Sequence, residues 1–353
     1  MEINKIDQIV SSYVGDNFSP TDEEMSYISE QYKQLQAILV GVDIFQTGSY
    51  ARLTAITPVN DLDVIWVIPE QEVKKLLGGE TINKVIQAEE IDVHDIINDL
   101  ANKLKGEYKK IGEQVAIKPQ THSVGIYFGA DDEFSIDVVP AIELPGKNED
   151  FKLSFYKVPN ILKFTHKTRQ KKYASGENIT WIKSDPRGYK KQAQALEENT
   201  DGSFRKTVKL IKKWRQGCKM KTSNFKLKSF HLEMIITNYL LENSDAGIYK
   251  CLVWFYGELP TFLIRAQIND RADSKRYIDE YVTNLTEQQK VAIRSYKDKA
   301  IEAVGKISQA NSEDQVISAI KELVLINTTR TTSNPPPTYS VGSGSISRPW
   351  IRE

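Results

Sequence analysis

The sequence predicts an α+β protein with two lobes and a tail, and three observations support this prediction. Short strand-like runs alternate with helical patterns in residues 1–165, which predicts a mixed sheet with helices. Long helical patterns dominate residues 166–326, which predicts a helical lobe. Residues 327–353 are rich in Thr, Ser, Pro and Gly and contain few residues that could build a core, which predicts a flexible tail.

The first lobe begins with a helix expected over residues 21–40, which Thr21 can cap and Gly41 can close. Residues 61–68 are two acids followed by an almost continuous apolar run, as in a buried central strand. Apolar residues spaced by about 3.6 predict a helix over residues 85–108. Three further strands are predicted at 114–118, 122–128 and 133–139. In the second lobe, helices are predicted at 201–217, 228–243, 286–307 and 312–326.

The composition excludes several classes of protein. The 47 basic and 47 acidic side chains balance to a formal charge of +0, which argues against coating of nucleic acid through charge alone. Cys218 and Cys251 form no CxxC pair, so they indicate small residues in a reducing compartment. The N-terminus lacks an apolar signal core, and no apolar run approaches the ~20 residues that span a bilayer. These features predict a cytoplasmic protein without membrane attachment.

Two acids open the predicted strand at 61–68. Asp61 and Asp63 are two residues apart, so their carboxylates would project from the same side of the strand. Like charges this close repel unless a cation lies between them, and Mg²⁺ prefers carboxylate oxygens. The pair therefore favours a metal site, with two solvated acids at a strand end as the alternative.

A third acid, Asp137, lies within the apolar run at 134–139. A carboxylate in such a strand costs energy unless it is paired or bound to metal. Two Mg²⁺ ions (or Mn²⁺) would need a third carboxylate to hold them about 3.5–4 Å apart. Asp137 could also accept the proton of an attacking hydroxyl. A Lys or Arg partner for Asp137 is the alternative.

A Gly-Ser turn precedes the acids. Gly48 and Ser49 lie between a predicted strand and a short helical stretch expected at 51–56. Glycine lets the backbone turn tightly near a ligand, and serine offers a hydroxyl and backbone N–H groups to an anion. A plain turn is the alternative interpretation.

Together these residues resemble a known family. The run QTGSYARLTAI at 46–56, followed by DLDV at 61–64, resembles the signature of polymerase-β-type nucleotidyltransferases. Its form is most similar to the bacterial cyclic oligonucleotide synthases of the CD-NTase family, which act in anti-phage (CBASS) defence. The run IDVVPA at 136–141 is similar to the strand that carries the family's third aspartate. The resemblance implies a polymerase-β-like catalytic lobe, with the active site in the cleft between it and the helical lobe. It also implies catalytic and metal-binding roles for Asp61, Asp63 and Asp137.

Two further matches lie in predicted helices of the second lobe. LIKKW at 210–214 resembles the family's lysine-bearing helix, and KSFHLE at 228–233 resembles its serine-bearing helix. The resemblance implies nucleotide-binding roles for Gly48, Ser49, Arg52, Lys212 and Ser229.

The second lobe also carries a basic strip. Residues 202–232 contain ten Lys or Arg residues and no Asp or Glu. The strip would attract triphosphates or a nucleic-acid activator, with a solvated helix face as the alternative. On a helical wheel Phe204, Val208, Ile211 and Trp214 form the buried side, and Lys212 borders it.

The leading functional hypothesis is condensation of nucleoside triphosphates, ATP among them, into a cyclic di- or trinucleotide second messenger with release of pyrophosphate. A nucleic acid or a protein would be the activator, and a downstream effector would receive the diffusible product. Two alternatives stay open. One is nucleotide transfer to an RNA, protein or small-molecule acceptor, and the other is a catalytically silent nucleotide- or nucleic-acid-binding module.

Overall fold

The computed structural model describes residues 1–76, 93–120, 122–129, 133–160 and 181–326. The described chain groups into two compact units. The sheet unit comprises Thr21–Ala51 and Pro58–Lys190, and the helical unit comprises Met1–Pro20, Arg52–Thr57 and Lys191–Asn334, as far as these ranges are described.

This division differs from the one predicted from sequence. Residues 1–20 and 52–57 were expected in the first lobe, but they group with the helices of the second. The predicted boundary at 165 and the predicted tail at 327–353 lie outside the described residues. The cleft expected between the lobes stays a prediction.

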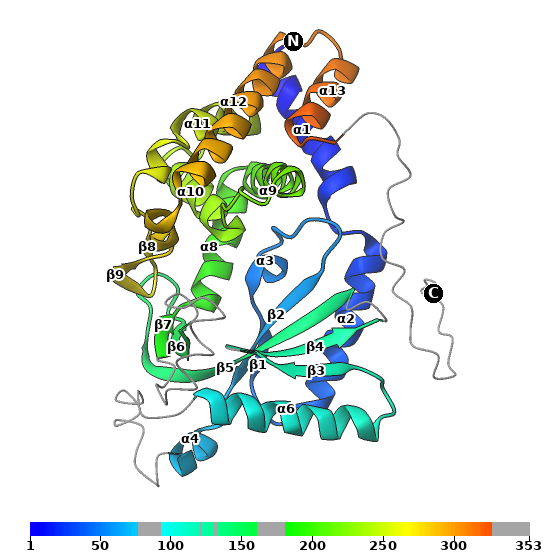
Figure 1. Ribbon diagram of the computed structural model, residues 1–353, viewed down its shortest axis with the longest axis vertical. Helices are drawn as coiled ribbons and strands as arrows, with labels where there is room; N and C mark the ends of the chain where they lie inside the picture. The colour runs from blue at the N-terminus through cyan, green and yellow to red at the C-terminus, as the bar shows by residue number, and fades with distance from the viewer. Residues whose placement is uncertain (77–92, 121, 130–132, 161–180, 327–353) are drawn as a thin grey trace. The chain divides into compact units, whose positions relative to one another are not determined.

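The sheet unit is built on a seven-stranded mixed sheet, in which the order β1-β2-β5-β4-β3 is extended by β6 on β5 and β7 on β6. Strands β2 and β5 run parallel, and the other neighbours are antiparallel (Figure 1). The strands are β1 (Ile44–Gln46), β2 (Asp61–Val67), β3 (Ala116–Pro119), β4 (Val124–Phe128), β5 (Phe134–Lys147), β6 (Ser154–Pro159) and β7 (Trp181–Ser184). The β2–β5 pair at the centre carries the acids of the candidate site.

Helices cover this sheet and fix its edges. The helix α2 (Asp22–Ile38) is capped by Thr21, as the sequence predicts, and Thr21 and Glu24 together form a capping box. The helix α6 (Val93–Lys110) buries its apolar face and contacts β3 and β4 (Figure 1). Its Tyr108 ring packs edge-on against Phe128, with centroids 6.4 Å apart. Two short helices, α3 (Gly48–Ala51) and α4 (Glu70–Leu76), flank β2 in the chain.

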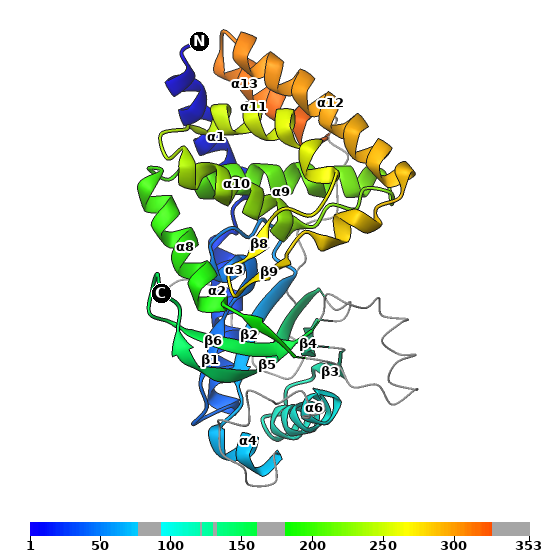
Figure 2. The ribbon, with the colours of Figure 1, turned by 90° about the vertical axis from the view of Figure 1, so that its left-hand side faces the viewer.

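The helical unit packs its helices around α9 (Ser203–Lys221) and α10 (Ser229–Glu242), which lie side by side (Figure 2). Its other elements are α1 (Ile3–Phe18), α11 (Ile248–Glu258), η2 (Thr261–Leu263), β8 (Asn269–Asp270), β9 (Asp273–Tyr277), η3 (Glu280–Asn284), α12 (Glu287–Gln309) and α13 (Glu313–Leu323). The helix α8 (Pro186–Asn199) belongs to this unit from Lys191 onwards. Trp214, only 1% exposed, packs edge-on against Phe225 and Tyr256 at the centre of this unit. In the described part of the chain, none of the helices has the length and apolar character needed to cross a membrane.

Candidate active site

The three predicted acids lie on the central β2–β5 pair. Asp63 is directly opposite Asp137 in the parallel register, and Asp61 lies two residues before Asp63 on the same strand. Residues two apart on a strand, and residues paired across strands, project from the same face of a sheet. The intervening Leu62 and Ile136 are 0% exposed, so they fill the core on the opposite face. The structure therefore brings Asp61 and Asp63 to one face, as predicted, and the register of β5 adds Asp137 to the same face.

The environment of Asp137 disfavours its ionised form. Burial and, secondarily, the negative charge of Asp61 raise the pKa of Asp137 to about 6. A hydrogen bond from the Gln120 side chain, at 2.9 Å, acts in the opposite direction. No Lys or Arg partner accounts for this carboxylate among the contacts described here. Because a bound cation would offset both the burial of this carboxylate and its repulsion by Asp61, Asp137 is well suited to act as a metal ligand.

The donor type fits Mg²⁺ or Mn²⁺, which prefer carboxylate oxygens. In the part of the chain that the structure describes, no group of three or more His, Cys, Asp or Glu side chains is placed so that it could hold a metal ion. The acids thus share a face without converging on one point, and metal binding by Asp61, Asp63 and Asp137 stays a prediction.

The Gly-Ser turn packs directly against one of these acids. The Thr47 N–H donates to the Asp63 carbonyl at 2.8 Å, which brings the turn onto β2. Gly48 has a φ of +69°, and a Cβ there would lie 1.8 Å from the Asp63 Oδ2 atom. Only glycine fits this conformation and this approach. Ser49 follows in α3 and is half-buried, beside the acid face rather than remote from it.

The chain after this turn differs from the prediction. The helical stretch expected at 51–56 is not formed, because α3 ends at Ala51. Leu53 has a φ of 60°, the left-handed region that L-residues other than Asn and Asp rarely adopt, and this stops the helix. The backbone strain is held in place by contacts on both sides of Leu53.

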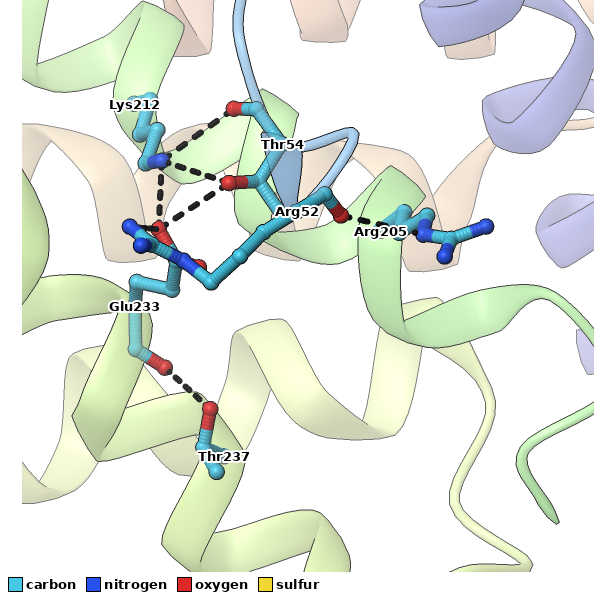
Figure 3. Close-up of polar contacts among 6 residues, drawn as sticks. All are labelled: Arg52, Thr54, Arg205, Lys212, Glu233 and Thr237. Atoms are coloured by element: carbon cyan, nitrogen blue, oxygen red, sulfur yellow. Dashed lines mark hydrogen bonds and ion pairs between the residues drawn. The ribbon is translucent and has the colours of Figure 1, made fainter. Parts of the chain in front are cut away.

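Those contacts form the Glu233 cluster, defined as Arg52, Thr54, Lys212 and Glu233 (Figure 3). The Arg52 Nε donates to Glu233 Oε1 at 2.6 Å, and the Lys212 Nζ donates to Glu233 Oε2 at 2.6 Å. The Thr54 hydroxyl donates to Glu233 Oε2 at 3.0 Å, and both the hydroxyl and the carbonyl of Thr54 accept from Lys212, at 3.0 and 3.1 Å. All members of the cluster lie within the helical unit.

The cluster is buried, and its one carboxylate, Glu233, is shared by two cations. Glu233 is 1% exposed, Lys212 5% and Arg52 8%. Burial opposes ionisation of Glu233, but the charges of Arg52 and Lys212 and their hydrogen bonds outweigh it and lower its pKa to about 2. Burial lowers the pKa of Lys212, and attraction to Glu233 counteracts this shift. We conclude that Glu233 is ionised and holds both cations.

This arrangement bears on two residues that were predicted to bind the nucleotide, Lys212 and Arg52. The Lys212 ammonium has three donors, and three acceptors already surround it. Arg52 is paired with Glu233 and packs over the Phe230 ring at 4.9 Å. Both side chains hold the chain around Thr54. Glu233 was not singled out from the sequence, although a lone acid in the apolar run SFHLEMIITNYLL is an available signal.

The basic strip is partly internal. Phe204, Val208, Ile211 and Trp214 are at most 1% exposed, as the helical wheel predicts. Lys209 is 9% exposed and donates to the Ser19 hydroxyl at 2.9 Å. Burial, followed by the nearby Lys206 charge, lowers its pKa to about 8. Ser229 is the first residue of α10, one turn before Glu233.

Comparisons with known proteins agree with this architecture. No protein-family profile matches the chain. The cyclic AMP-AMP-AMP synthase of Escherichia coli (strain MS 115-1) is 25% identical over 258 residues, which cover 68% of this chain and 66% of that protein. The match thus spans slightly less than two thirds of this relative's length.

Solved structures with the same fold cover nearly the whole chain. E. coli MS115-1 CdnC, in a complex with HORMA-deltaN, has a TM-score of 0.62 at 19% identity, over 90% of this chain and 96% of that one. The Vibrio cholerae di-nucleotide cyclase DncV has a TM-score of 0.56 at 12% identity, over 94% and 82%. The Rhodothermus marinus c-UMP-AMP synthase CdnE has a TM-score of 0.51 at 14% identity, over 85% and 96%.

The chain therefore has the two-lobe α+β fold of the nucleotidyltransferases that make cyclic oligonucleotides, which confirms the fold class predicted from sequence. Within that class, the sequence match and the structural neighbours confirm the resemblance to the CD-NTase family.

Proposed function

We propose that this protein joins nucleoside triphosphates into a cyclic di- or trinucleotide second messenger, with release of pyrophosphate, as an anti-phage signal. The observation that carries the proposal is the register of Asp63 against Asp137, with the Gly48 turn packed on Asp63. The fold supports it, as does the similarity to a protein named cyclic AMP-AMP-AMP synthase.

The proposed reaction is attack of a ribose hydroxyl on the α-phosphate of a bound triphosphate. Asp61, Asp63 and Asp137 would hold two divalent ions, which lower the pKa of the attacking hydroxyl and stabilise the leaving pyrophosphate. Asp137 could also accept the proton of the attacking hydroxyl. Ser49 and the backbone of its turn would bind phosphate oxygens.

In the helical unit we propose Ser229, the first residue of α10, as a group that contacts the triphosphate. Lys212 can bind a phosphate oxygen only by exchanging one of its three present acceptors. We therefore assign Lys212 and Arg52 primarily to holding the 52–54 segment that follows the Gly-Ser turn.

The direct test is incubation of the protein with mixed labelled triphosphates and Mg²⁺. Products resistant to nuclease and phosphatase should form with the wild type and disappear in Asp61→Ala plus Asp63→Ala. Glu113→Ala removes an exposed acid of the same unit and should leave synthesis unchanged. Mass spectrometry of the product then gives the bases and the ring size.

The same experiment separates the two alternatives. A product that forms only when RNA, a protein or a small molecule is added would favour transfer to an acceptor. Nucleotide binding without turnover and without metal dependence would favour a silent binding module. Equal synthesis by the wild type and the double aspartate variant would refute the assignment of these acids.

We also propose that an activator controls synthesis. The structure of CdnC with HORMA-deltaN supports a protein activator, since a protein partner is bound to a structural neighbour there. Purified protein that is inactive alone and active with a co-expressed protein would support this proposal, and stimulation by nucleic acid would favour the other predicted activator.

A further inference from the structure

A glutamine from a neighbouring hairpin contacts the third carboxylate. Gln120 directly follows β3 at the turn towards β4, and its backbone N–H donates to the Ser123 carbonyl at 2.8 Å. Its side-chain Nε2 donates to Asp137 Oδ1 at 2.9 Å. Gln120 lies between the strands predicted at 114–118 and 122–128 and was given no role from the sequence, so this contact is revealed by the fold.

Two other side chains fix the orientation of the Gln120 amide. The Ser123 hydroxyl donates to Gln120 Oε1 at 3.2 Å, and Nε2 also donates to the Tyr127 hydroxyl at 3.0 Å. A carboxamide has acceptors at one end and two donors at the other. Because Ser123 occupies the acceptor end, the donor end faces Asp137 and Tyr127. Ser123 is 0% exposed, so this contact is protected from water.

The backbone beneath this amide is adapted to it. Gly125 of β4 is directly opposite Asp137 of β5 in the antiparallel register. A Cβ at Gly125 would lie 2.5 Å from Gln120 Nε2 and 2.7 Å from the Tyr127 ring. Any residue larger than glycine would therefore displace the amide that contacts Asp137. The turn, the glycine and the two hydroxyls combine to hold one side chain against one carboxylate.

We infer that Gln120 is a positioning residue: its side chain holds the carboxylate of Asp137 in a fixed orientation for metal binding. A donor on Oδ1 restrains rotation of the carboxylate, so its remaining lone pairs keep one direction before a cation arrives. Groups that hold metal ligands in this way typically change metal affinity by about 10–100-fold when they are removed. This inference rests on the proposed metal-dependent function of the acids, and it assigns no contact with substrate to Gln120.

The test is Mn²⁺ binding to the metal-free full-length protein without nucleotide, measured by electron paramagnetic resonance. Gln120→Leu removes both hydrogen-bonding ends of the side chain and should weaken Mn²⁺ binding by about 10–100-fold. Gln114→Leu changes the same residue type at an exposed position before β3 and should bind as the wild type does. Asp61→Ala plus Asp63→Ala identifies which bound Mn²⁺ belongs to this site.

A purely structural role would have a different signature. Thermal melting of the metal-free variants measures stability separately from metal affinity. Gln120→Leu should lose Mn²⁺ affinity although it is still fully folded at the temperature of the binding assay. Tyr127→Phe removes a partner of the amide but keeps the contact with Asp137, so it should have a smaller effect on affinity than Gln120→Leu. An affinity of Gln120→Leu within twofold of the wild type overturns the inference. So does a wild type that binds no Mn²⁺ at these acids.

The synthesis assay distinguishes this inference from the proposed function. A wild type that binds Mn²⁺ with the expected dependence on Gln120 but makes no cyclic product would support the inference and refute the synthase proposal. If product is formed, Gln120→Leu should raise the Mg²⁺ concentration needed for half-maximal synthesis more than it lowers the rate at saturating Mg²⁺.

Discussion

Glu233 is the carboxylate that pairs with two buried cations, Arg52 and Lys212, so its removal should strongly destabilise the helical unit. In Glu233→Gln the side chain keeps its shape but loses its charge, and Arg52 and Lys212 stay buried without a carboxylate. Breaking a buried ion pair by removing one partner typically costs about 3–5 kcal/mol, because the remaining charge is left uncompensated.

The pKa of Glu233 gives a similar magnitude. A carboxyl group whose pKa falls from 4.5 in the unfolded chain to about 2 in the folded protein contributes about 3 kcal/mol at neutral pH. Because the folded pKa is the lower one, this contribution is fully present above pH 4.5 and is lost as the pH falls towards 2. The burial that lowers the pKa of Lys212 offsets part of it. We therefore expect a loss near the lower end of the range, about 3 kcal/mol.

The assay is urea unfolding followed by far-UV circular dichroism and by tryptophan fluorescence, to which the buried Trp214 of the helical unit contributes as one of five tryptophans. Glu242→Gln, at the exposed end of the same helix, is the matched control and should change the free energy of unfolding by less than about 0.5 kcal/mol. The difference between Glu233→Gln and the wild type should shrink between pH 4.5 and pH 3. A loss of unfolding free energy below about 1 kcal/mol at pH 7, or one that does not depend on pH, would refute the assignment of Glu233 as the ionised partner of Arg52 and Lys212.

Two further predictions concern the acid face. Gly48→Ala should abolish synthesis, because its Cβ would collide with Asp63. Gly112 also has a positive φ, of +75°, but has open space around it, so Gly112→Ala should cost only about 1 kcal/mol of stability without loss of synthesis. Equal synthesis by the two variants would contradict this prediction. Mn²⁺ affinity should be constant above pH 6 and fall about tenfold per pH unit below it, because the ion must displace the proton of Asp137, whose pKa is about 6. An affinity measured by electron paramagnetic resonance that is unchanged between pH 5 and pH 7 would show that Asp137 is not a ligand.

Local signals made much of the fold predictable. Thr21 and Glu24 form the capping box that starts α2, and the predicted strand at 61–68 is β2, Asp61–Val67. The helices predicted at 201–217 and 228–243 are α9 and α10, with ends that differ by a few residues. Each of these elements depends on residues that are close together in the sequence, where periodicity and capping are informative.

Other elements lacked such a signal. The helix α1, Ile3–Phe18, was not predicted, because no side chain caps its start and no acid stands in its first turn. The strand β7, Trp181–Ser184, and the hairpin of β8 and β9 were missed because short strands owe their stability to partners distant in the sequence. Of the predicted helix at 85–108, residues 93–108 are in α6 and the rest lies outside the described residues.

The candidate site shows the same division between local and distant information. The spacing of Asp61 and Asp63 was enough to predict a shared face, and the parallel register added Asp137 to it. The spacing could not show that Gln120 reaches Asp137, since that contact depends on the β3–β4 turn and on the missing side chain of Gly125. It could not show the role of Glu233 either, because its partners are 21 and 181 residues away in the chain.

The family-like run at 46–56 therefore combines two structural roles in one stretch of sequence. Gly48 and Ser49 belong to the sheet unit, where the turn packs on Asp63, whereas residues 52–57 group with the helical unit through Glu233. Because Leu53 adopts a left-handed conformation between Arg52 and Thr54, the change from one role to the other is abrupt. Similarity to a nucleotidyltransferase signature in this run thus reflects how the segment is anchored as well as the phosphate binding proposed for Ser49 and its turn. For that reason the match at Arg52 indicates an anchor to Glu233 more directly than a contact with the nucleotide.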